Sequence, residues 1–134
     1  MALLPQNPIS LFTANSVREE LEAAAKAHGV PAEDVEKTAR ITGCGEFLSR
    51  HPYDLSGGER QRAALAALIM TKPKILLLDE PTKGLDAAYK KELADILKSL
   101  CSDGATVIAV SHDIEFCAEY ADICALIFAG SAAA

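Results

Sequence analysis

Two adjacent carboxylates, Asp79 and Glu80, follow a run of apolar residues in the stretch ILLLDEPTKGLD, which covers residues 75–86. A carboxylate at the C-terminal end of a parallel strand faces the crevice in which such sheets bind ligands. There Asp79 can hold a magnesium ion, and Glu80 can orient and deprotonate an attacking water. The same residues also suit a plain turn after a strand, so other groups must support a hydrolytic interpretation.

Three further features offer such support. In SGGE, residues 56–59, Gly57 and Gly58 leave amide N–H groups uncovered at a helix start, where the helix dipole is positive and suits a phosphate. The same four residues can equally be a capping box with a flexible entry. His112 follows the apolar run TVIAVS and is expected to point into the crevice of Asp79, although a lone histidine there commonly has a structural role. Gln6 is, by itself, compatible with a solvated side chain.

The predicted elements alternate in type along the second half of the chain. We predict helices over 16–28, 31–43, 56–71, 86–104 and 113–120, and strands over 75–79, 106–111 and 123–128. Continuous apolar runs separated by helices indicate a parallel sheet whose strands are buried on both faces. We therefore divide the chain into an entry segment 1–15, a helical part 16–71 and a sheet part 72–130. Residues 131–134, SAAA, are interpreted as a cloning remnant outside the fold.

Composition limits the function classes. The 134 residues carry a formal net charge of -6 with a pI near 5.0, which argues against binding to the nucleic-acid backbone. The apolar run Ala63–Met70 is too short to cross a bilayer, which takes about 20 residues. There is no signal-peptide pattern, and the four cysteines lack metal-type spacing, so we expect buried thiols in a reducing compartment. A cytoplasmic location is predicted.

Read in order, Gln6, LSGGERQR, LLLDEPTKGLD and VSHD closely resemble the ATPase subunit of ABC transporters over almost the whole chain. The resemblance implies an α/β fold, with an incomplete P-loop NTPase-like parallel sheet of about three strands and an ABC-type helical subdomain. It also implies ATP and Mg²⁺ as cofactors. By the same resemblance, Gln6 is the glutamine that senses magnesium and the membrane partner, and Ser56, Gly57 and Gly58 form the signature that closes on ATP held by the opposite subunit. Asp79 is the magnesium-binding Walker B aspartate, and Glu80 is the catalytic glutamate. Asp86 is the D-loop aspartate that crosses the dimer interface, and His112 is the switch histidine near the γ-phosphate.

The resemblance also implies partners. They are a second ATPase subunit or domain and integral membrane transporter subunits, which would hold the protein at the inner face of the membrane. The stretch PQNPISLFTANSVREEL is similar to energy-coupling-factor and cobalt-type importers. The short spacing between Gln6 and Leu55 leaves no room for the long coiled coils of chromosome-maintenance and DNA-repair relatives. A soluble, non-transport ABC protein in translation or repair is the less favoured alternative because the chain is acidic.

One expected element is absent from the sequence. A phosphate loop needs G-x-x-x-x-G-K-[ST], and none of the eight glycines precedes a lysine. We therefore interpret the chain as the C-terminal, signature-bearing fragment of an ABC ATPase that binds ATP poorly and hydrolyses it negligibly alone. The alternative is a non-catalytic interaction module that docks on a partner or supplies its signature in trans.

The missing loop also predicts a gap in the sheet. In the family, the strand that feeds the loop lies beside the strand matching 106–111, and losing its apolar and hydrogen-bonding contacts costs on the order of 10 kcal/mol. We predict that the gap is filled in one of two ways. Either the strand 123–128 pairs with 106–111, or two copies exchange strands in a homodimer.

Overall fold

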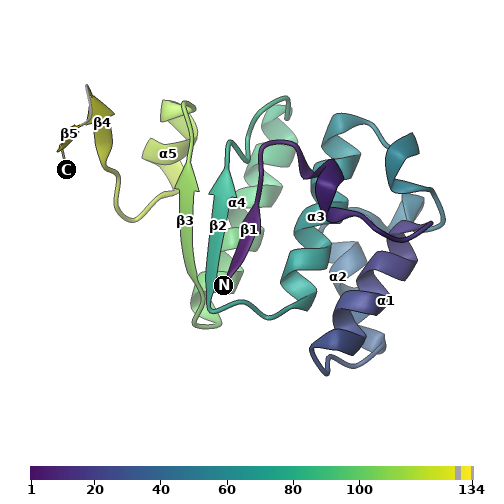
Figure 1. The fold of residues 1–134 in the computed structure, drawn as a ribbon. Coiled ribbons are helices and arrows are strands. Elements are labelled where there is room, and N and C mark those ends of the chain that lie inside the picture. The colour runs from purple at the N-terminus through teal and green to yellow at the C-terminus, as the bar shows by residue number, and fades with distance from the viewer. Residues whose placement is uncertain (129–130, 134) are drawn as a thin grey trace.

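A computed structural model describes residues 1–128 and 131–133 (Figure 1). The strands are β1 (Ala2–Leu4), β2 (Ile75–Asp79), β3 (Thr106–Val110), β4 (Leu126–Phe128) and β5 (Ser131–Ala133). The α-helices are α1 (Val17–Ala27), α2 (Glu33–Ile41), α3 (Gly57–Met70), α4 (Ala87–Ser102) and α5 (Ile114–Tyr120). Three short 3₁₀ turns, Pro8–Leu11, Gly45–Phe47 and Pro52–Asp54, join the elements of the first half.

The main sheet is parallel, with strand order β1-β2-β3. β2 pairs with β3 along its whole length, from Ile75 opposite Thr106 to Asp79 opposite Val110. On its other side it pairs with β1, where Leu4 lies opposite Leu78. The expectation of a three-stranded parallel sheet is confirmed, but its third strand is β1 and not the predicted strand 123–128. Three residues at the start of the chain show too little periodicity to reveal a strand.

Only one face of this sheet is covered. Leu4, Leu76 and Leu78 project to the same side and are fully buried, in one core with Leu93 and Leu97 of α4. On the opposite side Ile108 is 52% exposed and Val110 is 62% exposed. The prediction that β2 and β3 are buried on both faces is therefore wrong: helices cover one face, and no element in the described part of the chain covers the other.

The helical part is a cluster beside β1. Helices α1, α2 and α3 pack on one another, and α3 also contacts β1 (Figure 1). Ser16 caps α1 by accepting a hydrogen bond from the Glu19 amide at 3.2 Å. The run Ala63–Ala66 of α3 is buried, as its continuous apolar sequence predicts. This cluster fixes where the first turn of α3 lies relative to the sheet.

The chain ends in a small hairpin apart from the main sheet. β4 pairs antiparallel with β5, with Leu126 opposite Ala133 and Phe128 opposite Ser131. The prediction that 123–128 moves across to pair with 106–111 is therefore wrong, because β4 pairs with β5 in a separate sheet and β3 pairs with β2. Ser131–Ala133, expected to lie outside the fold, form that strand, and Ala134, for which the same was expected, lies outside the described residues. The strand-exchanged dimer remains a prediction.

Two sequence-based expectations about environment have different outcomes. In the described part of the chain, no helix is long and apolar enough to cross a membrane. The four cysteines are free thiols, but only Cys44 is buried, whereas Cys101 and Cys124 are exposed. The expectation of uniformly buried thiols is wrong because Cys101 lies on the outer side of α4 and Cys124 on the exposed loop before β4.

Candidate functional site

The carboxyl ends of the three parallel strands bring four predicted site residues to one edge of the sheet. Leu4 of β1 lies opposite Leu78, and Asp79 lies opposite Val110 of β3. Gln6, Asp79, Glu80 and His112 therefore all follow or end strands that stop at the same level. Ligands of parallel α/β sheets bind at this edge. Gln6, Asp79 and His112 are exposed there, and the His112 side chain is 77% accessible.

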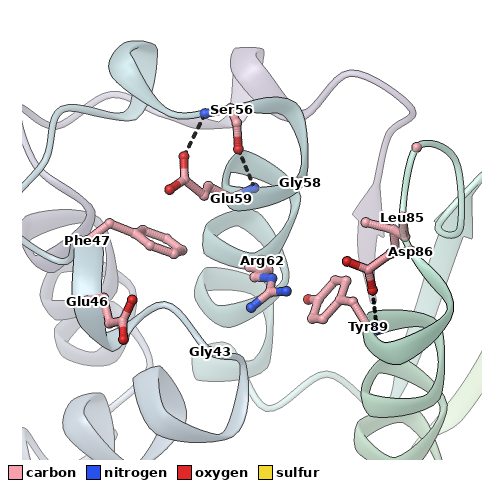
Figure 2. A pocket seen from close by; sticks show the side chains of 11 residues that line it. Gly43, Glu46, Phe47, Ser56, Gly58, Glu59, Arg62, Leu85, Asp86 and Tyr89 are labelled. Carbon is pink, nitrogen blue, oxygen red and sulfur yellow. Dashed lines mark hydrogen bonds between the residues drawn. The ribbon is translucent and has the colours of Figure 1, made fainter.

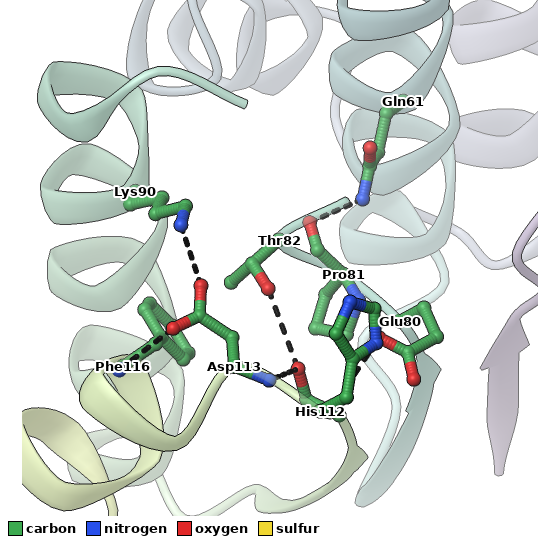
Figure 3. Close-up of polar contacts among 9 residues, drawn as sticks. Gln61, Glu80, Pro81, Thr82, Lys90, His112, Asp113 and Phe116 are labelled. Carbon is green, nitrogen blue, oxygen red and sulfur yellow. Dashed lines mark hydrogen bonds and ion pairs between the residues drawn. The ribbon is translucent and has the colours of Figure 1, made fainter. Parts of the chain in front are cut away.

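Glu80 and His112 form a direct pair at this edge (Figure 3). The His112 Nδ1 lies 2.7 Å from Glu80 Oε2, and the His112 backbone N–H donates to the same oxygen at 3.4 Å. Both contacts use Oε2, which leaves Oε1 for another donor. The hydrogen bond from His112 holds the pKa of the Glu80 carboxyl below its usual value. An ionised carboxylate with one free oxygen can orient a water molecule.

The backbone at Glu80 has an uncommon conformation that aims this side chain. Its φ of 52° lies in the left-handed region, which non-glycine residues rarely adopt. The Glu80 N–H still donates to the Val110 carbonyl oxygen at 2.8 Å, so the sheet pairing continues to this residue before the chain turns. Strained backbone of this kind clusters at functional sites. The conformation places the carboxylate against His112 at the end of the neighbouring strand.

The oxygen donors at the edge fit a magnesium ion only in part. Among the described residues, there is no group of three or more His, Cys, Asp and Glu side chains that could hold a metal. The Asp79 carboxylate and the Gln6 amide oxygen are donors of the hard type that Mg²⁺ prefers. Magnesium usually takes one or two carboxylates and completes its shell with water and substrate phosphates. Asp79 and Gln6 therefore suit an ion that arrives with a phosphate ligand.

Next to His112 in the chain, Ser111 and Asp113 belong to a polar network that was not predicted from the sequence. Lys90 of α4 donates to Asp113 Oδ2 at 2.5 Å, and Asp113 Oδ1 accepts from the Phe116 amide at 3.1 Å, which caps α5 (Figure 3). The Asp113 amide donates to Ser111 Oγ at 3.1 Å, and this hydroxyl shares a hydrogen bond with buried Thr82. The helix-capping position of Asp113 was readable from the sequence, but its lysine partner 23 residues away was not.

The predicted signature residues lie at the start of α3, close to Asp86 at the start of α4. Ser56 accepts from the Glu59 amide at 3.3 Å, and the Glu59 carboxylate accepts from the Ser56 amide at 2.8 Å, which completes a capping box. These bonds satisfy two amides and leave those of Gly57 and Gly58 at the positive helix end. Ser56, Gly58 and Asp86 line one cavity of about 290 Å³ (Figure 2).

The site residues therefore fall into two groups within one chain. Gln6, Asp79, Glu80 and His112 occupy the sheet edge, and none of them lines the cavity beside Ser56 and Asp86. A hydrogen bond from the Gln61 side chain of α3 to the Pro81 carbonyl oxygen links the two regions through the turn after β2 (Figure 3). The start of α3 and the two carboxylates are thus linked by a hydrogen bond but do not share a pocket.

Comparison with known proteins identifies the family. A family described as ABC transporter matches residues 1–83, more than half of the chain. The chain belongs to the ABC transporter ATP-binding family. Over 128 residues it is 39% identical to a protein of Clostridium tetani named as an ABC transporter ATP-binding protein, covering 95% of this chain and 29% of that protein. A similarly named protein of Pyrococcus horikoshii is 40% identical over 121 residues, covering 87% of this chain and 46% of the relative.

A solved structure agrees on the fold. The chain superimposes on the ATP-binding subunit of an ABC transporter with a TM-score of 0.78 and 24% sequence identity, over 90% of this chain and 51% of the other. The expected α/β class with a P-loop NTPase-like parallel sheet is confirmed by this likeness. The chain spans about half or less of the length of each of these relatives. At the family level, it is related to ABC transporter ATP-binding subunits.

Proposed function

We propose that this chain is the signature, Walker B and switch part of an ABC transporter ATPase, and that it presents its signature to ATP held by a second subunit. The observation that supports the proposal is the separation of the site residues into two groups. Gly57 and Gly58 begin α3 beside the cavity lined by Ser56 and Asp86, and neither Asp79 nor Glu80 lines that cavity. A nucleotide at the sheet edge of one subunit therefore needs the α3 end of another.

Each group has a distinct proposed role. Asp79 and Gln6 hold a magnesium ion that accompanies the phosphates, and ATP supplies the bond that is hydrolysed. Glu80 orients the attacking water through Oε1, and His112 holds Glu80 and reaches the terminal phosphate. Ser56, with the two glycine amides, closes on the phosphates of the facing subunit, and Asp86 crosses the interface beside it. The division into an entry segment 1–15, a signature part 16–71 and a hydrolytic part 72–130 follows from these roles.

The uncovered side of the sheet is proposed to receive the phosphate-binding part. Parallel sheets in α/β proteins are normally covered on both faces, yet Ile108 and Val110 are more than half exposed and β3 has β2 as its only partner among the described strands. No glycine of the 134 residues precedes a lysine. A strand carrying a phosphate loop and its following helix would pair with β3 and bury this face. The further partners, membrane transporter subunits of the energy-coupling-factor or cobalt-importer type at the cytoplasmic face, rest on the resemblance around residues 5–21.

The trans role can be tested by complementation. The intact Pyrococcus horikoshii relative, with its own signature disabled by substitution, is mixed with this chain, and ATP hydrolysis is measured. We expect hydrolysis to rise with added chain and not with a Gly57→Asp variant. An Asp side chain at position 57 would meet open space, and it would bring a negative charge to the amides that are proposed to bind phosphate. Gly45→Asp, which also has open space and lies outside the signature, is the matched control and should rescue like the wild type. Equal rescue by both variants would contradict the proposal.

Nucleotide binding separates the proposal from an intact catalytic domain. Without the amide nest and lysine of a phosphate loop, the isolated chain should bind Mg-ATP far more weakly than micromolar in a calorimetric titration. Micromolar affinity would show that this chain binds the triphosphate without a second subunit, and would contradict the proposal. If complementation also fails, the non-catalytic docking module becomes the better description, and pull-down with purified membrane subunits would identify it.

A further inference from the structure

A cation–π contact joins α3, the helix that begins at the proposed signature, to α4, the helix that Asp86 caps. The guanidinium carbon of Arg62, on α3, lies 3.7 Å from the ring centroid of Tyr89, on α4 (Figure 2). Tyr89 is only 3% exposed, and Arg62 is half-buried. A cation over an aromatic face is attracted by the ring quadrupole, more strongly when water is excluded. The contact therefore joins two helices through residues that are 27 positions apart in the sequence.

The position of this pair relative to the site is specific. Arg62 lies one helical turn after Gly58, and the Tyr89 amide donates to Asp86 Oδ1 at 2.8 Å, which caps α4. A Cβ added at Gly58 would lie 3.9 Å from Leu85 Cδ2, so the starts of the two helices face one another directly. Arg62 and Tyr89 line the same cavity as Ser56 and Asp86.

The loop after α2 closes the other side of Arg62. Gly43 has a φ of 67°, in the left-handed region, and a Cβ placed on it would lie 2.7 Å from Arg62 Nη1. No side chain fits there while the guanidinium stays on Tyr89. The backbone of this loop and the ring of Tyr89 thus hold Arg62 from opposite sides.

We propose that Arg62 and Tyr89 are positioning residues that set the spacing between the start of α3, which carries the signature, and the start of α4, which carries Asp86. The functional meaning rests on the proposed function, because both helix starts would face the same second subunit and must meet it together. Neither residue touches a nucleotide in this scheme. A change on one helix should therefore displace the motif on the other helix.

The test changes Arg62 on α3 and records backbone amides just before and at the start of α4, in the whole chain and without nucleotide. Amide resonances of Gly84 and Asp86 are recorded by ¹H–¹⁵N NMR in Arg62→Met and Arg62→Lys variants, with Gly29 as an internal reference. We expect Arg62→Met to shift both reporters while Gly29 stays in place. Arg62→Lys keeps a cation over the ring and should restore them toward their original positions. Shifts confined to α3, or equal shifts with Lys and Met, would overturn the proposal.

A double-mutant cycle measures the coupling independently of the spectra. The unfolding equilibrium constants of Arg62→Met, Tyr89→Leu and the double variant are compared in urea. We expect the double variant to be less destabilised than the product of the single effects, by a factor of about 2 to 30, the range for partly desolvated cation–π pairs. Additive effects would refute the contact as a coupling. If Arg62→Met fails to fold, Arg62→Gln replaces it in both measurements.

These results do not depend on nucleotide chemistry. Failed complementation with intact NMR and thermodynamic coupling would contradict the proposed function alone. Successful complementation by both Arg62→Met and the wild type, with unmoved reporters, would contradict the positioning role alone.

Discussion

Removing the hydroxyl of Tyr89 should stabilise this protein. The Tyr89 ring is 3% exposed, and its hydroxyl oxygen is buried without a hydrogen-bond partner among the described residues. An unsatisfied buried polar group costs about 1–3 kcal/mol. Tyr89→Phe keeps the ring that lies against Arg62 and removes only this group. We expect the free energy of unfolding to rise by about 1 kcal/mol, below the full penalty because the lost oxygen leaves a small void.

The assay is urea unfolding followed by circular dichroism, with thermal unfolding as a second measurement. A gain of about 1 kcal/mol corresponds to roughly 3–5 °C in Tm for a domain of this size. Tyr53→Phe is the control, because Tyr53 is largely exposed and its hydroxyl is solvated, so its stability should stay within about 0.5 kcal/mol of the wild type. A loss of more than about 0.5 kcal/mol in Tyr89→Phe would refute the reasoning, since it would mean that the hydroxyl has a favourable partner.

The same hydroxyl also predicts a pH dependence in alkali. Burial raises the pKa of Tyr89 well above its ordinary value of 10.0, and the Arg62 charge opposes the effect without cancelling it. Above pH 10.0 the unfolded chain loses this proton while the folded chain keeps it, so the native state binds more protons and stability falls as pH rises. The contribution of Tyr89 to stability is fully present below its pKa in the unfolded chain and is lost as pH rises through its pKa in the folded chain. Tyr89→Phe should show a shallower alkaline decline than the wild type.

Two further variants test other contacts of the site region. Gly43→Ala should lower the free energy of unfolding by about 1–3 kcal/mol, because it strains the left-handed backbone and displaces Arg62. Gly29 has nearly the same φ but open space around it, so Gly29→Ala should lower the free energy of unfolding by about 1 kcal/mol, from backbone strain alone. Equal losses in urea titrations would contradict the role of Arg62. Asp113→Asn should weaken the fall in the free energy of unfolding at acid pH. Lys90 lowers the pKa of the Asp113 carboxyl below its ordinary 3.8, so the stabilisation is present above that value and is lost as pH falls through the folded-state pKa. Asn also caps helices well, so an unchanged acid limb between pH 6 and 2 would show that the Lys90–Asp113 pair contributes nothing.

The sequence was a good guide wherever a local pattern decides the structure. Ser56 and Glu59 form the expected capping box, and Asp86 caps α4 where it was expected to. Leu93, Ile96 and Leu97 form the buried face of that helix. These features depend on residues within one or two turns, where hydrogen bonding and helical periodicity leave few alternatives.

The errors concern strand pairing and burial, which depend on segments far apart in the sequence. β1 was missed because a three-residue strand has too few residues to show alternation. The strand 123–128 was assigned to the sheet because apolar residues predict a strand but not its partner, and the structure pairs its last three residues with Ser131–Ala133 instead. Exposure of Ile108 and Val110 was equally hidden, since burial depends on which elements cover a face.

The sequence by itself determined the family, the helix boundaries and the chemical types available for ATP chemistry, because motifs and caps are short-range properties of the chain. Only the tertiary structure decided which of those groups meet. It joined Glu80 to His112, linked Arg62 to Tyr89, and placed Ser56 and Gly58 at a cavity that Asp79 and Glu80 do not line. The physical reason is that strand register and helix packing set distances between residues far apart in sequence, and those distances depend on the whole core rather than on any single segment.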